Sequence, residues 1–256
     1  MQDLTITLIQ SALHWQNKAA NFEKNERIFE TLGKTDLVIL PEMFTTGFTM
    51  QPEQLAEDFP GESVDWMATQ ARRLNAVITG SIAVRESGHY YNRLIWMRPS
   101  GEYETYDKRH LFRMAGEDKH YSAGQKRLIV EYKGWRICPL VCYDLRFPVW
   151  SRNRNDYDLL IYVANWPRVR RDPWRALLPA RAIENLCYVV GVNRVGEDGN
   201  GFAHSGDSMV IGPKGNSLFH SADEEISPTI TLSSEALIKF RERFPAHKDA
   251  DDFVIQ

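Results

Sequence analysis

The chain of 256 residues contains only three cysteines, which form neither a CxxC pair nor a spacing typical of disulfides. Such sparse cysteine is typical of a reducing compartment, so we expect a cytoplasmic protein without disulfide bonds. No apolar run approaches the roughly 20 residues that a membrane-spanning helix requires. The first residues, "MQDLTITLIQ", lack the basic and apolar regions of a secretory signal. The sequence therefore indicates neither export nor a membrane partner.

An excess of charge of one sign is also absent. Lysine and arginine number 31 against 34 aspartate and glutamate residues, a net charge of −3, which predicts no nucleic-acid partner. The arginines of "RNRN" and "RVRRD" lie among acidic and aromatic residues, which is more typical of solvated surface than of an anion site. No P-loop or GxGxxG motif occurs in a phosphate-binding context, and His110, His120 and Cys142 lack metal-ligand spacing. We therefore expect no metal and no cofactor.

Short apolar runs rich in β-branched residues alternate with helical patterns along the chain. Residues 4–10 and 36–42 are predicted to be buried strands, whereas residues 19–32 and 61–75 have helical periodicity. We expect about ten to twelve strands, more than one open sheet holds comfortably. The sequence therefore predicts an α/β fold with two mixed sheets packed face to face and helices outside. No linker divides the chain, which predicts one domain over residues 1–256, with a C-terminal helix and tail at about 233–256.

Three chemically useful side chains follow predicted strands. Glu42 ends "VILPE", Lys108 follows the strand before "YDKRHLF", and Cys142 ends "ICPLVC" just before a predicted helix. Side chains at the carboxyl ends of strands in α/β folds face the crevice where ligands bind. We expect Lys108 and the helix start to lower the pKa of Cys142 and so favour the nucleophilic thiolate. Glu42 would take the thiol proton, and Lys108 with the backbone N–H of Tyr143 would hold the oxyanion of an acyl-transfer intermediate.

Each of these residues also has a purely structural interpretation. A lone cysteine in an apolar strand is usually an inert core residue, and this is our interpretation of Cys138 and Cys187. A glutamate after a strand is more often a cap or an ion-pair partner, and a lysine there often lies on the surface. From the residues alone, a cysteine hydrolase and an inert core cysteine both remain open.

Several segments together resemble the nitrilase superfamily of carbon–nitrogen hydrolases. They are "LVILPEMFTTGF", "YDKRHLF", "LVCYDLRFP", "ANWP" and "ARAIENLCYVVGVNRVG", in the order that the family has them, and they span nearly the whole chain. Each fragment alone is weak, but the combination is specific. The resemblance implies a four-layer α-β-β-α sandwich, a Glu–Lys–Cys catalytic triad and no cofactor.

Carried over by position, the resemblance assigns four catalytic residues. Glu42 matches the general base, Lys108 the oxyanion-stabilising lysine and Cys142 the nucleophile. The family also has a second glutamate between the lysine and the cysteine, and Glu117 in "GEDKHYSAG" is its best match. Other glutamates fit less well by position, namely Glu102, Glu104 and Glu131.

Within the superfamily, "CYDLRFP" resembles the omega-amidase branch, which hydrolyses ω-amides of small dicarboxylates such as 2-oxoglutaramate and 2-oxosuccinamate to the acid and ammonia. Arg146 is then a candidate for binding the far carboxylate of the substrate, or it pairs with Asp144 or another acidic residue of the elbow. Phe44 and Trp166 are candidates for apolar pocket walls, or they belong to the core. Pro179 has no place in the family pattern and should kink its helix.

The resemblance leaves alternatives of several kinds. Within the same chemistry these are an amidase for deaminated glutathione and an N-carbamoyl or nitrile hydrolase. A protein of another class would be a catalytically silent binding or scaffold protein with the same fold. Family members commonly pair through helices beside the active-site elbow, so the resemblance also implies a homodimer, with residues 233–256 at its interface.

Overall fold

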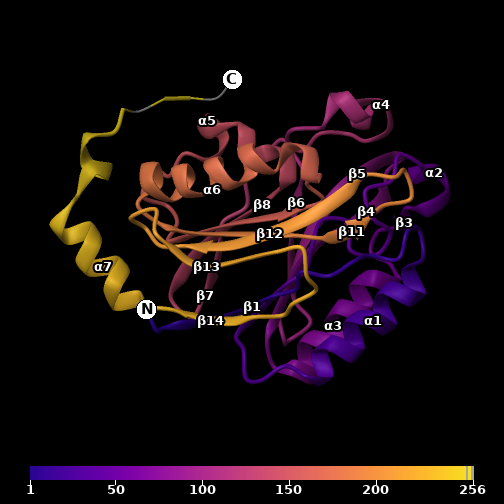
Figure 1. Ribbon diagram of the computed structural model, residues 1–256, viewed down its shortest axis with the longest axis horizontal. Coiled ribbons are helices and arrows are strands. Elements are labelled where there is room, and N and C mark those ends of the chain that lie inside the picture. Colours follow the sequence, from indigo (N-terminus) through magenta and orange to yellow (C-terminus); the bar gives the residue numbers. More distant parts are fainter. Residues whose placement is uncertain (252, 255–256) are drawn as a thin grey trace.

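The chain folds into two mixed β-sheets, as Figure 1 shows. The structure is a computed structural model and describes residues 1–251 and 253–254. Within these residues the first sheet has seven strands, in the order β14 (Thr229–Leu232), β1 (Leu4–Leu8), β2 (Leu37–Ile39), β4 (Val77–Glu86), β5 (His89–Met97) and β6 (Tyr103–Asp107), with β3 (Glu57–Asp58) beside β4. Strands β1, β2 and β4 are parallel, whereas β5, β6 and β14 pair antiparallel to their neighbours.

The second sheet has the same number of strands and a similar design. In the part of the chain that the structure describes, its seven strands run in the order β11 (Val195–Glu197), β12 (Ala203–Ile211), β10 (Tyr188–Asn193), β9 (Leu159–Ala164), β8 (Trp135–Val141) and β7 (Val130–Tyr132), with β13 (Ser217–Ala222) beside β12. Strands β8, β9 and β10 form its parallel centre. The mixed character predicted from the alternation of helices and hairpins is therefore confirmed in both sheets.

Helices cover the outer faces of both sheets, which confirms the predicted sandwich of helices around two sheets (Figure 1). The first sheet is covered by α1 (Lys18–Glu30) and α3 (Glu62–Leu74), and the second by α6 (Arg171–Asn185), with the short α5 (Pro148–Ser151) beside it. The remaining helices are α2 (Pro52–Leu55), α4 (Glu117–His120), α7 (Ser234–Arg243) and the 3₁₀-helices η1 (Arg113–Ala115), η2 (Cys142–Arg146), η3 (Arg168–Arg170) and η4 (Ala246–Asp249).

Strand β2 shows why the sequences of the central strands are continuous apolar runs. Leu37 and Ile39 pack between the two sheets, whereas Val38 and Leu40 pack against the helices outside. Successive side chains of a strand point to opposite faces, so a strand covered on both faces needs apolar residues throughout. Each such side chain stabilises the fold by roughly 1.5–3 kcal/mol when fully buried.

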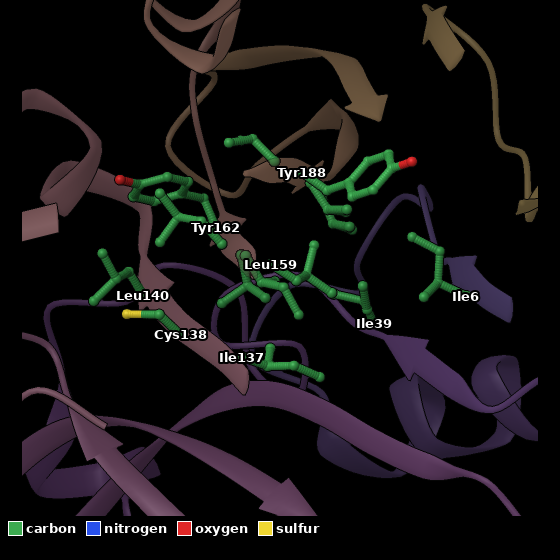
Figure 2. Close-up of a cluster of buried hydrophobic side chains, with 14 of the residues drawn as sticks. Ile6, Ile39, Ile137, Cys138, Leu140, Leu159, Tyr162 and Tyr188 are labelled. Carbon is green, nitrogen blue, oxygen red and sulfur yellow. The ribbon is translucent and has the colours of Figure 1, made fainter. Parts of the chain in front are cut away.

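The main core lies between the two sheets. Figure 2 shows Ile6 and Ile39 of the first sheet on the same side as Ile137 and Leu159 of the second, whereas Cys138 and Leu140 point to the other face of β8. Two of the three cysteines belong to the same buried hydrophobic cluster: Cys138 and Cys187 are fully buried and unbonded. Burial raises the pKa of both thiols. Their interpretation as core residues is confirmed.

One expectation about the elements needs correction. The number of strands exceeds ten to twelve because β3 and β11 are pairings of two and three residues, too short to leave a pattern in the sequence. Helix α6 includes Pro179 within its bounds, although a proline cannot donate the backbone hydrogen bond of its position, and the kink expected there stays a prediction. None of the helices in the described ranges is long and apolar enough to cross a membrane.

The C-terminal helix α7 packs beside the second sheet. Arg241 of α7 forms an ion pair with Asp158 and donates to the backbone carbonyl of Leu186 at 2.8 Å. Burial alone would raise the pKa of Asp158, but hydrogen bonds from Arg136 and the charge of Arg241 outweigh it, so that its pKa lies below the usual 3.8. Beyond the helix, the Phe253 ring lies under the Arg154 guanidinium of the same chain, 4.5 Å from its carbon. The dimer interface expected at 233–256 stays a prediction, and residues 252, 255 and 256 of that range lie outside the described residues.

Candidate active site

Both sheets contribute to one buried cluster of polar side chains. Glu42 follows β2 and Lys108 follows β6, both in the first sheet, whereas Cys142 follows β8 in the second. All three are buried, with Cys142 the most exposed at 8%. The site therefore lies where the carboxyl ends of these strands meet, and it exists only because the two sheets are packed together.

Lys108 stands between two carboxylates. Its Nζ donates to Glu42 Oε1 at 2.9 Å and to both carboxylate oxygens of Glu117, each at 2.9 Å. Glu117 opens the four-residue helix α4, and its Oε2 also accepts from the backbone N–H of Phe112 at 2.6 Å. The structure thus brings together all four residues that the family resemblance assigned to catalysis.

Two asparagines complete the cluster, and sequence reasoning missed both. Asn92 Nδ2 donates to Glu42 Oε1 at 2.8 Å and to Glu117 Oε1 at 3.3 Å. The backbone N–H of Asn165 donates to Glu42 Oε2 at 2.8 Å. Asn165 belongs to the "ANWP" segment that supports the resemblance, so a signal for it was present. Asn92 sits inside a hairpin strand whose local sequence gives no sign that it faces the site.

The charges of the cluster depend on one another. Burial alone would lower the pKa of Lys108, but the negative charges of Glu117 and Glu42 outweigh it and hold its pKa above the usual 10.5. Burial raises the pKa of Glu117; the Lys108 ammonium opposes this shift and the Glu42 carboxylate adds to it. Lys108 is therefore a permanent cation at neutral pH, and its charge is what makes two buried carboxylates tolerable.

The thiol of Cys142 behaves differently from our expectation. Burial raises its pKa well above the usual value, the Glu42 carboxylate raises it further, and Lys108 only partly opposes the two. Lys108 acts in the predicted direction, but the prediction that the pKa of Cys142 lies below its usual value is wrong. Burial outweighs the nearby cation, and the following helix is only the short 3₁₀-helix η2. Cys142 rests as a thiol, so its reaction as a nucleophile requires a base to take the proton.

Cys142 occupies a sharp turn between β8 and η2. Its φ of +47° lies in the left-handed region, which costs a non-glycine residue roughly 1–2 kcal/mol. Asp144 stabilises this turn: its Oδ2 accepts from the backbone N–H of Val141 at 3.0 Å and from Tyr106 Oη at 2.7 Å. Its Oδ1 lies 2.7 Å from His110 Nδ1 and accepts from the His110 backbone N–H at 3.0 Å. Because His110 follows Lys108 by two residues, Asp144 links the Lys108 and Cys142 segments.

The cluster opens onto a cavity of about 960 Å³. Cys142 and Lys108 line it, as do the predicted binding residues Tyr143, Arg146 and Trp166. Arg146 does not pair with Asp144 in the described structure. The Arg146 guanidinium instead lies over the Trp166 ring, 5.4 Å from its centroid. The role of the Tyr143 N–H in oxyanion binding stays a prediction.

Phe44 is not part of the cavity wall, and that prediction needs correction. Its side chain is fully buried between α3 and the first sheet, with the Trp66 ring 5.8 Å away. The chain turns sharply after Glu42, where Met43 has a φ of +42°, and the aromatic residue of this loop that lines the cavity is Phe48. The Lys108 ammonium lies 5.1 Å from the centroid of that ring.

The cavity contains one further cation that the sequence analysis left as surface. Arg170, at the end of η3, lines the cavity with its guanidinium 5.0 Å from the centroid of Phe112. It stands in the "RVRRD" segment, where an anion site was the less favoured interpretation. Among residues 1–251 and 253–254, no group of three or more His, Cys, Asp or Glu side chains is arranged to hold a metal ion.

Comparison with known proteins agrees with this arrangement. Residues 5–239 match the carbon-nitrogen hydrolase family. The chain is 52% identical to the omega-amidase YafV of Escherichia coli K12, over 99% of both chains, and 32% identical to the 2-oxoglutaramate amidase of Bacillus subtilis, over 96% of both.

Solved structures have the same fold. XC1258 from Xanthomonas campestris, a CN-hydrolase superfamily protein with an arsenic adduct in its active site, superposes with a TM-score of 0.98 at 49% identity over the whole of both chains. Nit3 of Saccharomyces cerevisiae, a member of branch 10 of the nitrilase superfamily, superposes with a TM-score of 0.87 at 25% identity over 95% of both. With the family match spanning most of its length and these relatives covering it almost end to end, the chain belongs to the carbon-nitrogen hydrolase family of the nitrilase superfamily.

Proposed function

We propose that this protein is an omega-amidase, which hydrolyses ω-amides of small dicarboxylates such as 2-oxoglutaramate and 2-oxosuccinamate to the acid and ammonia. The similarity to an omega-amidase and to a 2-oxoglutaramate amidase supports the substrate class. The observation that carries the chemistry is the buried cluster of Glu42, Lys108 and Glu117 beside Cys142, at the wall of a cavity.

In the proposed reaction, Glu42 takes the proton of the Cys142 thiol as the sulfur attacks the amide carbon. The negative charge that develops on the carbonyl oxygen is held by the Lys108 ammonium and by the backbone N–H of Tyr143. The amide nitrogen leaves as ammonia with the proton that Glu42 returns, and a thioester remains on Cys142. Glu42 then takes a proton from water as the water oxygen attacks the thioester carbon, the C–S bond breaks, and the acid leaves while Glu42 returns the proton to the Cys142 sulfur. Glu117 keeps Lys108 in place throughout.

The raised pKa of Cys142 supports a base-assisted attack in particular. A thiol that rests protonated gains reactivity only when a base is positioned beside it, and burial together with the Glu42 carboxylate is what raises this pKa. The same carboxylate that discourages the free thiolate is therefore the group that accepts its proton when substrate is present.

Ammonia release tests the proposal. Wild-type protein, Cys142→Ala and the core-cysteine control Cys138→Ala are assayed with 2-oxoglutaramate and with deaminated glutathione. We expect release of ammonia from 2-oxoglutaramate by the wild type and the control, and none by Cys142→Ala. Equal release by all three proteins would refute the nucleophile assignment. A marked preference for deaminated glutathione would overturn the proposed substrate, and no release by any protein would favour a silent scaffold.

We also infer that the protein works as a cytoplasmic homodimer. Apolar side chains are exposed on the helices near the active-site elbow and on the C-terminal segment: Val149, Ile183, Ile238 and Phe244. Exposed apolar groups of this kind support an interface with a second copy. Light scattering should give twice the chain mass of 29.6 kDa, and a mass of one chain at micromolar concentration would contradict the dimer.

A further inference from the structure

Two arginines face the cavity without a carboxylate partner. Arg146 and Arg170 both line it, and within the described residues neither guanidinium forms an ion pair or a side-chain hydrogen bond. The next arginines along the chain differ in this respect, since Arg168 pairs with Asp223 and Arg171 with Asp207. An unpaired cation in a cavity favours the binding of an anion from outside the chain.

Aromatic rings hold both guanidinium groups in place. Arg146 lies over Trp166, with its guanidinium carbon 5.4 Å from the ring centroid, and Arg170 lies over Phe112 at 5.0 Å. Trp166 connects the two, because its Nε1 donates to the backbone carbonyl of Arg170 at 2.6 Å. A guanidinium that contacts a ring through its face keeps its N–H edges available, and these match a carboxylate in bidentate fashion.

The two cations also lie close enough to affect each other. Burial lowers the pKa of Arg170, the charge of Arg146 lowers it further, and Cys142 acts in the opposite direction. Arg170 is half-buried and Arg146 is exposed, so water partly screens the repulsion between the two charges, and an anion bound between them relieves it. Cys142 lines the same cavity as both arginines, so an anion bound between them lies in the same space as the reacting sulfur.

We propose that Arg146 and Arg170 together form a carboxylate clamp that selects the substrate by its far end. The proposal rests on the omega-amidase function and assigns its specificity to this pair. A monoamide of a dicarboxylic acid places its amide carbon at Cys142 and its free carboxylate between the two guanidinium groups. Neutral amides of equal length reach the same sulfur but leave the two cations unpaired, so they are poorer substrates.

Matched substrates and a matched control test the clamp. Glutaramate and pentanamide have the same number of carbons and differ in a carboxylate against a methyl group. For Arg170→Ala we expect kcat/KM with glutaramate to fall about 10- to 100-fold, mainly through KM, because a hydrogen-bonded charge contact is lost. The effect on pentanamide should be much smaller. Arg168→Ala removes the same charge two residues away, outside the cavity, and should match the wild type with both substrates.

A second variant and a binding measurement complete the test. Arg170→Lys keeps the charge but not the bidentate geometry, and it should retain part of the preference for glutaramate. Calorimetric titration of glutarate into Cys142→Ala protein, with and without Arg170→Ala, measures the clamp without turnover, and we expect binding to weaken about 10-fold or more.

Three outcomes would overturn the clamp: an equal fall for both substrates, no change with glutaramate, or unchanged glutarate binding. If the wild type hydrolyses neither of these amides nor 2-oxoglutaramate, the omega-amidase function fails, and the glutarate titration still decides whether the clamp exists.

Discussion

Replacing Glu42 by glutamine should separate the two effects that this carboxylate has on Cys142. The change keeps the size of the side chain and removes its charge and its capacity to accept a proton. Loss of a positioned general base typically costs about 10²–10⁴-fold in rate, so we expect ammonia release by Glu42→Gln to fall by at least about a hundredfold. The thiol should respond in the opposite sense. Because the Glu42 charge raises the pKa of Cys142 and Lys108 lowers it, removing Glu42 should lower that pKa.

The hydrogen bonds that Glu42 accepts also determine how much stability the protein loses in Glu42→Gln. Oε1 of Glu42 accepts from Lys108 and Asn92, and Oε2 accepts from the backbone N–H of Asn165. A glutamine keeps the first oxygen but places an NH₂ group against the Asn165 N–H, so two donors face each other. An unsatisfied buried donor costs about 1–3 kcal/mol. For a chain of this size we expect Tm to fall by about 2–4 °C for each kcal/mol, which leaves the protein folded at the temperature of the assay.

Two measurements together decide this prediction. The first is ammonia release from an ω-amide, and the second is the rate of Cys142 alkylation by iodoacetamide across about pH 6 to 10, with the modified residue located by mass spectrometry. The midpoint of alkylation should move to lower pH in Glu42→Gln. Hydrolysis within about tenfold of the wild type, or a midpoint that moves upward, would refute the assignment of Glu42 as the base that also holds the thiol protonated.

Two further predictions concern groups outside the triad. Asp144→Asn should lower kcat about 10- to 100-fold with little change in KM, because the amide cannot accept from both His110 and the Cys142 turn; unchanged kcat in steady-state kinetics would show that Asp144 does not position the nucleophile. Asp158→Asn removes the ion pair with α7 and should lower Tm at neutral pH. The expected fall is about 2–4 °C for each kcal/mol by which the free energy of unfolding decreases. Since the folded-state pKa of Asp158 lies below 3.8, its contribution is complete above that pH and is lost as the pH falls through the folded value, so the melting curves of variant and wild type should converge in acid. A gap in Tm that persists below the folded pKa would contradict this sign.

Local patterns were enough to predict that the proposed catalytic residues lie at the ends of strands. Glu42, Lys108 and Cys142 each follow a run of strand-forming residues, and a polar residue at the carboxyl end of a buried strand reaches a crevice whatever the rest of the fold does. The two-sheet arrangement followed from the number of strands, and the family motifs supplied Glu117. These inferences need only the neighbouring sequence and the geometry of a strand.

What the sequence could not show depends on contacts between distant segments. Phe44 and Phe48 lie four residues apart in the same loop, and the left-handed residues Met43 and Gly47 turn the chain there, so the sequence alone does not show which ring reaches the cavity. Asn92 joins the site because β5 pairs between β4 and β6. The direction of the Cys142 pKa depends on how deeply the sulfur is buried, and a sequence shows which charges are present but not how much water surrounds them.

The contacts of Lys108 explain how one ammonium can serve both the resting enzyme and the proposed intermediate. At rest its Nζ donates to Glu42 as well as to both oxygens of Glu117. When Glu42 takes the thiol proton, its carboxylate becomes neutral. At the same time, attack by the sulfur places one negative charge on the carbonyl oxygen of the substrate. The number of charges in the site stays the same, so little solvation is lost in a buried environment. Lys108 then loses an attraction to Glu42 and gains one to the oxyanion, while Glu117 holds it unchanged. A resting thiolate would place a third negative charge beside these carboxylates, and this is why we expect the proton to leave Cys142 only together with attack on the substrate.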